Sequence, residues 1–129
     1  MGLGKAAKES RRAVVCDDDP VVCRIVTAVL QRCGYREVEQ TPFATVAVDL
    51  AEAMQPDLIV LDLNLDGESG LDAIPELRTV APGSRIVVYS GSGAMKGPAR
   101  RAGAHAVLNK VSMASVGELE RVVTDIDSE

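Results

Sequence analysis

The sequence predicts an α/β fold, a five-stranded parallel sheet covered by helices on both faces. Five short apolar segments alternate with segments of helical periodicity, which is the order of a (βα)5 doubly wound sheet. The connections between them are short, and parallel strands joined in this way make right-handed crossovers. The 129 residues, 47% of them apolar, suffice for one domain with its own core.

Two strands and two helices are expected in the first half of the chain. A strand at 13–16 precedes a helix that opens at Pro20, where Asp19 can cap it, and that ends near Gly34. A weak strand at 37–39 suits a sheet edge, and Thr41-Pro42 repeats the cap-then-proline pattern to open the next helix. The expected core-facing stripes are Val21, Val22, Ile25, Val26, Val29, Leu30 and Cys33 in the first helix, and Phe43, Val46, Ala47, Leu50, Ala51 and Met54 in the second.

The second half continues the alternation. Residues 57–62 form a nearly continuous apolar strand, as expected where helices cover both faces. A helix at 69–79 contains Pro75, which should kink or delay it. A strand at 85–89, a Gly/Ser-rich loop at 90–97, a short helix at 98–102 and a strand at 106–108 follow. The capping box that begins at Ser115 opens a last helix with an apolar face from Val116 to Ile126.

Composition excludes several classes of protein. Aromatic residues make up 2% of the chain and the pI is about 4.9, which argues against direct nucleic-acid binding. Since no apolar run reaches the ~18 residues of a membrane span, no membrane association is expected. Three cysteines without Cys-x-x-Cys spacing indicate reduced thiols in a cytoplasmic protein. Residues 1–11 are expected to be a flexible lead-in, and 12–129 the single domain.

Polar residues follow four of the five expected strands. In an open parallel sheet the carboxyl ends of the strands meet at one edge, where ligands bind. Clustered carboxylates repel one another unless a hard divalent cation or a lysine lies among them. A carboxylate beside such a cation, a lysine and a hydroxyl is equipped for phosphoryl transfer. The residues at these strand ends are Asp17, Asp18 and Asp19 after the first strand, Asp62 and Asn64 after the third, Ser90 after the fourth and Lys110 after the fifth.

In this order and spacing, the motifs resemble those of response-regulator receiver domains of two-component signalling. The resemblance covers about residues 12–126 and implies a flavodoxin-like sheet with strand order 2-1-3-4-5. The motifs are VVCDDDP at 14–20, LIVLDLNL at 58–65, VVYSG at 87–91, and AGA at 102–104 followed by LNK at 108–110.

The resemblance implies a role for each site residue. Asp62 would accept a phosphoryl group from the phosphohistidine of a sensor histidine kinase or a histidine phosphotransfer protein. Asp17, Asp18, Asp62 and the Asn64 carbonyl would hold Mg²⁺ (or Mn²⁺), with Asp17 acting through a bound water. The remaining roles are phosphoryl binding by Ser90, Gly91 and Lys110, and tuning of hydrolysis by Asn64 and Ser92.

The same resemblance implies signalling to a downstream protein partner or a homodimer through the face of the fourth helix, fifth strand and fifth helix. Catalysis would be limited to self-phosphorylation and autodephosphorylation. Val107 stands where the family usually keeps an aromatic switch residue, and strand alternation should aim Tyr89 at the opposite face.

Two alternative functions remain open. The first is a protein-interaction module of the same fold that phosphorylation does not switch, which the missing ring at Val107 favours. The second is a small haloacid-dehalogenase-type phosphatase with Asp17 as nucleophile and Asp19 as acid, since Asp-x-Asp after a first strand is that family's motif.

Overall fold

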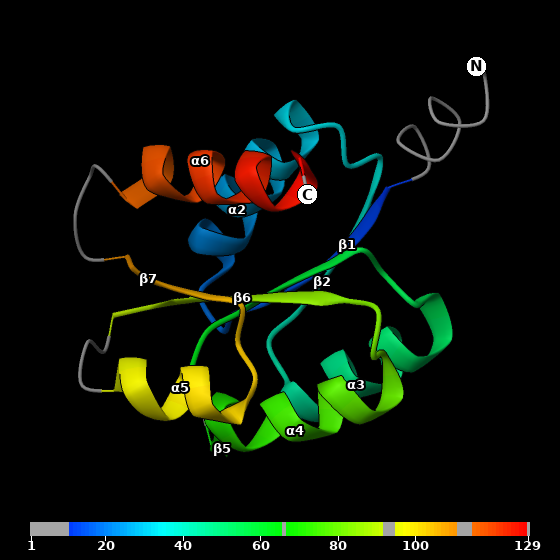
Figure 1. Ribbon diagram of the computed structural model, residues 1–129, viewed down its shortest axis with the longest axis vertical. Helices are drawn as coiled ribbons and strands as arrows, with labels where there is room; N and C mark the ends of the chain where they lie inside the picture. The colour runs from blue at the N-terminus through cyan, green and yellow to red at the C-terminus, as the bar shows by residue number, and fades with distance from the viewer. Residues whose placement is uncertain (1–10, 66, 92–94, 111–114, 129) are drawn as a thin grey trace.

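Five parallel strands form the central sheet of the computed structural model, which describes residues 11–128 except 66, 92–94 and 111–114 (Figure 1). The order across the sheet is β2-β1-β3-β6-β7. Counted along these five strands, this is the predicted order 2-1-3-4-5. The strands are β1 (Arg12–Cys16), β2 (Glu37–Thr41), β3 (Leu58–Leu61), β6 (Arg85–Ser90) and β7 (Ala106–Asn109).

Helices cover both faces of the sheet, so the core consists of two apolar layers (Figure 1). Alternation along β3 sends Ile59 and Leu61 into one layer, and Leu58 and Val60 into the other. This explains why the sequence of β3 is apolar at every position. On one side lie α2 (Pro20–Arg32) and α6 (Ser115–Ser128), and on the other α3 (Ala44–Met54), α4 (Gly70–Val80) and α5 (Lys96–Ala102).

A small antiparallel hairpin follows β3 and was not predicted. It consists of β4 (Asn64–Leu65) and β5 (Glu68–Ser69), with Asn64 opposite Ser69 and Leu65 opposite Glu68. Because it begins three residues after β3 ends, it lies at the carboxyl edge of the sheet.

The two cap-then-proline patterns have different outcomes. Helix α2 begins at Pro20, and the Asp19 carboxylate accepts a hydrogen bond from the Val21 N–H, as predicted. Before α3, however, Thr41 ends β2 and pairs with Cys16 of β1, so the helix begins only at Ala44. The prediction that Thr41 and Pro42 open this helix was therefore wrong.

The predicted core-facing stripes were wrong at their outer positions. Phe43 precedes α3 and is 51% exposed, and Val46 is 39% exposed, because α3 packs through its small residues instead. Val21 and Ile25 of α2 are likewise about half exposed. The residues that α3 does bury are Ala44, Ala47, Ala51 and Met54.

Several smaller predictions can be compared with the structure. Pro75 lies inside α4 and does not delay its start at Gly70, and α5 begins at Lys96, before the predicted position 98.

All three cysteines are free. Among the described helices, none is long and apolar enough to cross a membrane. The side chain of Ser115 lies outside what the structure describes, so its predicted capping role stays a prediction.

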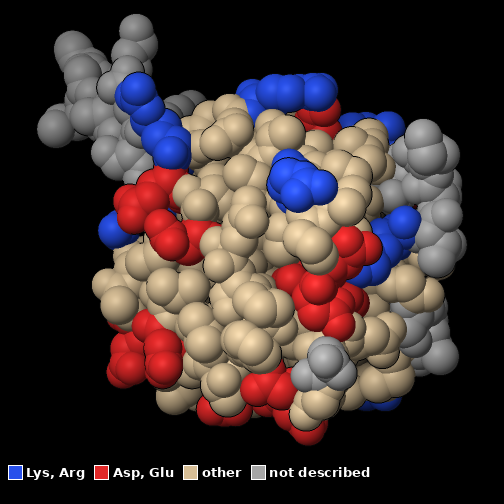
Figure 2. Space-filling model, turned by 180° about the vertical axis from the view of Figure 1, so that it is seen from behind, with Lys and Arg blue, Asp and Glu red and all other residues tan. Residues whose placement is uncertain are grey.

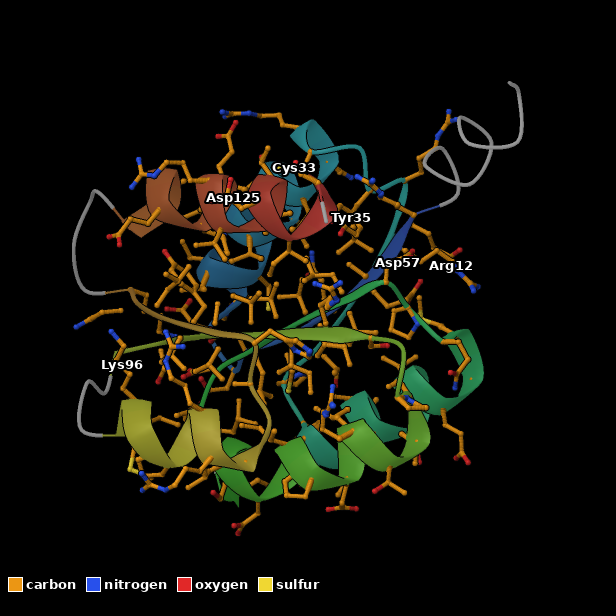
Figure 3. All side chains as sticks on the ribbon, viewed as in Figure 1. Arg12, Cys33, Tyr35, Asp57, Lys96 and Asp125 are labelled. Carbon is orange, nitrogen blue, oxygen red and sulfur yellow. The ribbon has the colours of Figure 1, made fainter. Side chains whose placement is uncertain are left out.

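A polar cluster ties the end of α6 to the start of the described chain. The Asp127 carboxylate accepts hydrogen bonds from the Tyr35 hydroxyl at 2.7 Å and from the Arg11 guanidinium at 2.9 Å. Figure 3 shows Tyr35 beside the final turn of α6. The pKa of Tyr35 is raised well above its usual value of 10.0. Burial is the largest cause, and the hydrogen bond to Asp127 is the second.

Tyr35 should therefore remain un-ionised in the folded protein at pH values where free tyrosine ionises. A raised pKa in the folded state gives stability that is complete below pH 10.0 and is lost as the pH rises above it. We expect the free energy of unfolding to fall above that pH by about 1.4 kcal/mol per pH unit from this residue alone, and the slope to flatten in Tyr35→Phe. Urea unfolding at several pH values, with phenolate absorbance, measures this. Ionisation of Tyr35 near pH 10 in the folded protein would contradict it.

Candidate functional site

The residues predicted at the strand ends converge at the carboxyl edge of the sheet. Cys16 of β1 pairs with Leu61 of β3, so Asp17 and Asp62 leave the sheet side by side. The Asp62 N–H also donates to the Cys16 carbonyl at 2.9 Å, which continues the pairing one step beyond the strands.

Lys110 joins the two buried carboxylates. Its Nζ lies 2.7 Å from Asp17 Oδ2 and 2.9 Å from Asp62 Oδ2, and both aspartates are 4% exposed. The Lys110 N–H donates to the Ser90 carbonyl, which fixes the chain after β7 beside the end of β6. The ammonium therefore compensates two negative charges that burial would otherwise make costly.

The same contacts shift the pKa values of this group. Burial acts to lower the pKa of Lys110, but its hydrogen bonds to Asp17 and Asp62 outweigh burial, so the pKa is raised. Burial raises the pKa of Asp17 by more than the bonds from Lys110 and from the Asp19 N–H lower it. We expect the ammonium to persist at neutral pH, since two carboxylate oxygens lie within 3 Å of it.

Asp17, Asp18 and Asp62 fit a hard divalent cation. Each offers one carboxylate oxygen, and these oxygens all lie within 4.8 Å of one another. Asp18 is exposed, so the group is open to solvent on one side. Three carboxylate oxygens are a donor set suited to Mg²⁺ or Mn²⁺. The Asn64 N–H donates to Asp62 Oδ1 at 3.1 Å, which holds Asn64 against this group.

Ser90 presents a buried hydroxyl toward the same edge. Ser90 is 2% exposed, and its Oγ has no hydrogen-bond partner among the described residues. A buried hydroxyl without a partner costs about 1–3 kcal/mol, so an anionic ligand that accepts its hydrogen bond would relieve this cost. Gly91 follows it and is exposed.

The two positions relevant to an aromatic switch lie on opposite faces. Val107 of β7 is half-buried against the layer that contains α5, whereas Tyr89 is buried in the layer of α2 and α6. The prediction that Tyr89 faces away is confirmed, and Val107 offers no ring. Ser92 lies outside the described residues.

Sequence reasoning missed three residues near the site. The Cys23 thiol donates to the Asp17 carbonyl at 3.3 Å, and it lines a cavity of about 340 Å³ together with Asp17 and Asp18. Glu68 and Gly70 lie in or beside the hairpin and contact the backbone of other elements. No local motif identifies them, because their contacts depend on how the hairpin packs.

The sequence matches the family model of the response regulator receiver domain over residues 13–121. The chain belongs to this family. The receiver domain is 27% identical over 83 residues to the chemotaxis protein CheY of Thermotoga maritima, covering 64% of this chain and 69% of that protein. It is 37% identical over 82 residues to the photosynthetic apparatus regulatory protein RegA of Rhodovulum sulfidophilum, covering 64% of this chain but 44% of that one.

Solved structures share the fold of this receiver domain. A putative response regulator from Chloroflexus aurantiacus superposes with a TM-score of 0.81 at 24% identity, covering 93% of this chain and 99% of that one. A response regulator from Burkholderia pseudomallei, solved with a phosphorylated aspartic acid, calcium ion and citrate, gives 0.73 at 29% identity, covering 92% and 74%. The architecture is therefore the CheY-like, flavodoxin-like one.

Proposed function

We propose that this receiver domain accepts a phosphoryl group on Asp62, in a Mg²⁺-dependent reaction, from the phosphohistidine of a sensor histidine kinase or histidine phosphotransfer protein in the cytoplasm. The observation that carries the proposal is the meeting of three carboxylates, the Lys110 ammonium and the unpartnered Ser90 hydroxyl at one edge. This combination supplies an acceptor, charge compensation and a hydrogen-bond donor for a phosphoryl group.

Each site residue has a separate role in the proposed reaction. Asp62 is oriented by the Asn64 N–H at Oδ1 and by Lys110 at Oδ2. One carboxylate oxygen attacks phosphorus, the new P–O bond forms, and the N–P bond to the donor imidazole breaks. Lys110 then compensates the phosphoryl charge, and the Ser90 hydroxyl donates to a phosphoryl oxygen. Mg²⁺ held by Asp17, Asp18, Asp62 and the Asn64 carbonyl would supply further positive charge.

A relative supports this assignment. The Burkholderia pseudomallei response regulator carries a phosphorylated aspartic acid and a calcium ion. At 29% identity it is similar enough to support the same chemistry here. The acceptor of this chain would be Asp62, because it follows β3 and touches the lysine.

Phosphorylation of Asp62 would change the charge at the site, and this change would alter the surface that a partner contacts. Lys110 follows β7 directly, so a phosphoryl group that draws Lys110 and Ser90 together would shift the face formed by α5, β7 and α6. The partner would be a downstream protein or a second copy. On the rear face, basic side chains form separate groups among acidic ones rather than a stripe (Figure 2), which supports a partner other than nucleic acid.

A module that phosphorylation does not switch is the second candidate, and Val107 is the observation that favours it. Without a ring at this position, a movement of Ser90 could change the position of β7 only through contacts between aliphatic side chains. A phosphatase has weaker support, because the Asp19 carboxylate, which would have to act as the acid, caps helix α2 by accepting a hydrogen bond from the Val21 N–H. We propose no turnover beyond self-phosphorylation and autodephosphorylation.

Phosphotransfer to Asp62→Asn tests the proposed function. With acetyl phosphate and Mg²⁺, we expect the mass of the wild type to increase by one phosphoryl group and that of Asp62→Asn to stay unchanged. Asp57→Asn, a change at the opposite edge of the sheet, should be phosphorylated like the wild type, and chelation of Mg²⁺ should stop phosphorylation of both. Equal phosphorylation of Asp62→Asn and the wild type would overturn the assignment.

A further inference from the structure

Helix α3 is capped by a residue from another element. Its N-cap position, Phe43, has a side chain that makes no capping hydrogen bond. Instead, Glu68 Oε1 accepts a hydrogen bond from the Ala44 N–H at 2.6 Å. A carboxylate at this position satisfies a backbone donor of the first turn and is favoured by the helix dipole.

This contact connects α3 to the backbone beside the phosphoacceptor. Glu68 belongs to β5, where it pairs with Leu65 of β4, and the next pair joins Ser69 to Asn64. The Asn64 N–H in turn donates to Asp62 Oδ1 at 3.1 Å. A continuous path of hydrogen-bonded residues therefore runs from the start of α3 through the hairpin to Asp62.

The packing around the hairpin is open on two sides, which makes this tether important. A cavity of about 220 Å³ lies between α3 and α4, and one of about 380 Å³ lies beside Leu65 and Met95. Glu68 lines both. Leu65 packs β4 into the core, at 7% exposure, so the hydrogen bond from Ala44 to Glu68 restrains the β5 side of the hairpin, where side chains do not fill the neighbouring space.

We propose that Glu68 is a positioning residue for the divalent cation and for phosphorylation. By holding the hairpin against α3, it keeps the Asn64 backbone turned toward Asp62, so the cation site forms without reorganisation of the loop. This inference rests on the proposed function, because it assigns the cation and the phosphoryl group to Asp62 and its neighbours.

The test compares two substitutions of Glu68 with a matched control. Glu68→Ala removes the acceptor, whereas Glu68→Gln keeps an acceptor oxygen and removes the charge. The control is Asp57→Ala, because Asp57 accepts a hydrogen bond from the Arg12 N–H at 3.0 Å at the far edge of the sheet. Figure 3 shows this pair at the start of β1, distant from the phosphoacceptor edge.

Three quantities are measured for each protein. These are the Mg²⁺ dissociation constant from NMR titration of the Asn64 amide, the hydrogen-exchange rate of the Ala44 amide without metal, and the phosphorylation rate with acetyl phosphate. In Glu68→Ala we expect about tenfold weaker Mg²⁺ binding, faster exchange at Ala44 and slower phosphorylation at limiting Mg²⁺. Glu68→Gln should stay within about twofold of the wild type, and Asp57→Ala should match it.

The results separate this inference from the proposed function. Unchanged Mg²⁺ affinity in Glu68→Ala would overturn the inference, as would an equal loss in Asp57→Ala or in Glu68→Gln, because positioning by the hydrogen bond predicts neither. If acetyl phosphate does not phosphorylate the wild type, the proposed function fails, while the Mg²⁺ titration and the exchange rate still decide the role of Glu68.

Discussion

Replacement of Gly70 by alanine should destabilise the domain by about 3 kcal/mol, the upper part of the usual range for overpacking. A Cβ at this position would lie 2.1 Å from the Asp62 carbonyl oxygen and 2.8 Å from the Leu63 Cα. Both are backbone atoms, so no side chain can turn aside to make room. Either the first turn of α4 or the chain after β3 has to move.

The same substitution should impair the site. The Gly70 N–H donates to the Leu63 carbonyl at 3.0 Å, and this bond opens if α4 withdraws. If the chain after β3 moves instead, the Asp62 backbone shifts relative to Asp17. In either case we expect weaker Mg²⁺ binding and slower phosphorylation of Asp62 than in the wild type.

Gly117 provides the matched control. It lies in α6, and a Cβ there would meet nothing within 4 Å. Alanine favours a helix over glycine by about 1 kcal/mol, so Gly117→Ala should raise the free energy of unfolding while Gly70→Ala lowers it. Urea unfolding of the three proteins measures both. A Gly70→Ala variant as stable as the wild type would show that the backbone contact at Asp62 is easily relieved.

The sheet and the convergence of the site were predictable because both depend on local patterns. Buried strands such as β3 are apolar at every position, and parallel strands place their carboxyl ends at one edge. Asp17, Asp62 and Lys110 each directly follow the last residue of a strand. Once the strands are recognised, the place of these residues is fixed, although the hydrogen-bonded bridge that Lys110 makes is visible only in the structure.

The hairpin and the start of α3 were not predictable because tertiary contacts determine them. Thr41 and Pro42 resemble a helix cap, yet pairing with β1 extends β2 through Thr41 and delays the helix to Ala44. The cap is then supplied by Glu68, more than twenty residues further along the chain. A two-residue strand has no periodicity to detect, so the sequence near Glu68 carries no signal for this contact.

Loss of the ammonium in Lys110→Met should destabilise the protein by about 3 kcal/mol at neutral pH without divalent cation. The substitution keeps an apolar chain of similar length but leaves the carboxylates of Asp17 and Asp62, at 3% and 4% side-chain exposure, without their shared counter-charge. Breaking a buried ion pair by removing one partner costs about 3–5 kcal/mol. Lys96→Met, on the exposed surface of α5, is the matched control and should change stability little.

The stability that Lys110 contributes should decrease at high pH. The pKa of Lys110 is raised above its usual 10.5, so its contribution to stability is complete below that pH and is lost as the pH rises through the folded-state value. The difference between wild type and Lys110→Met in urea unfolding should therefore be largest near neutral pH and shrink above pH 10.5. A difference that persists unchanged at high pH would assign the effect to lost packing of the lysine chain rather than to its charge.

A bound divalent cation should reduce the difference in free energy of unfolding between the wild type and Lys110→Met. In the wild type a bound cation shares Asp17 and Asp62 with an ammonium already 2.7 Å and 2.9 Å from their oxygens, whereas in Lys110→Met it would meet two uncompensated carboxylates. Because a ligand that binds the folded state stabilises it more the more tightly it binds, Mg²⁺ should raise the free energy of unfolding more in Lys110→Met than in the wild type. Equal gains in the two proteins would mean that Lys110 and the cation do not compensate the same charges.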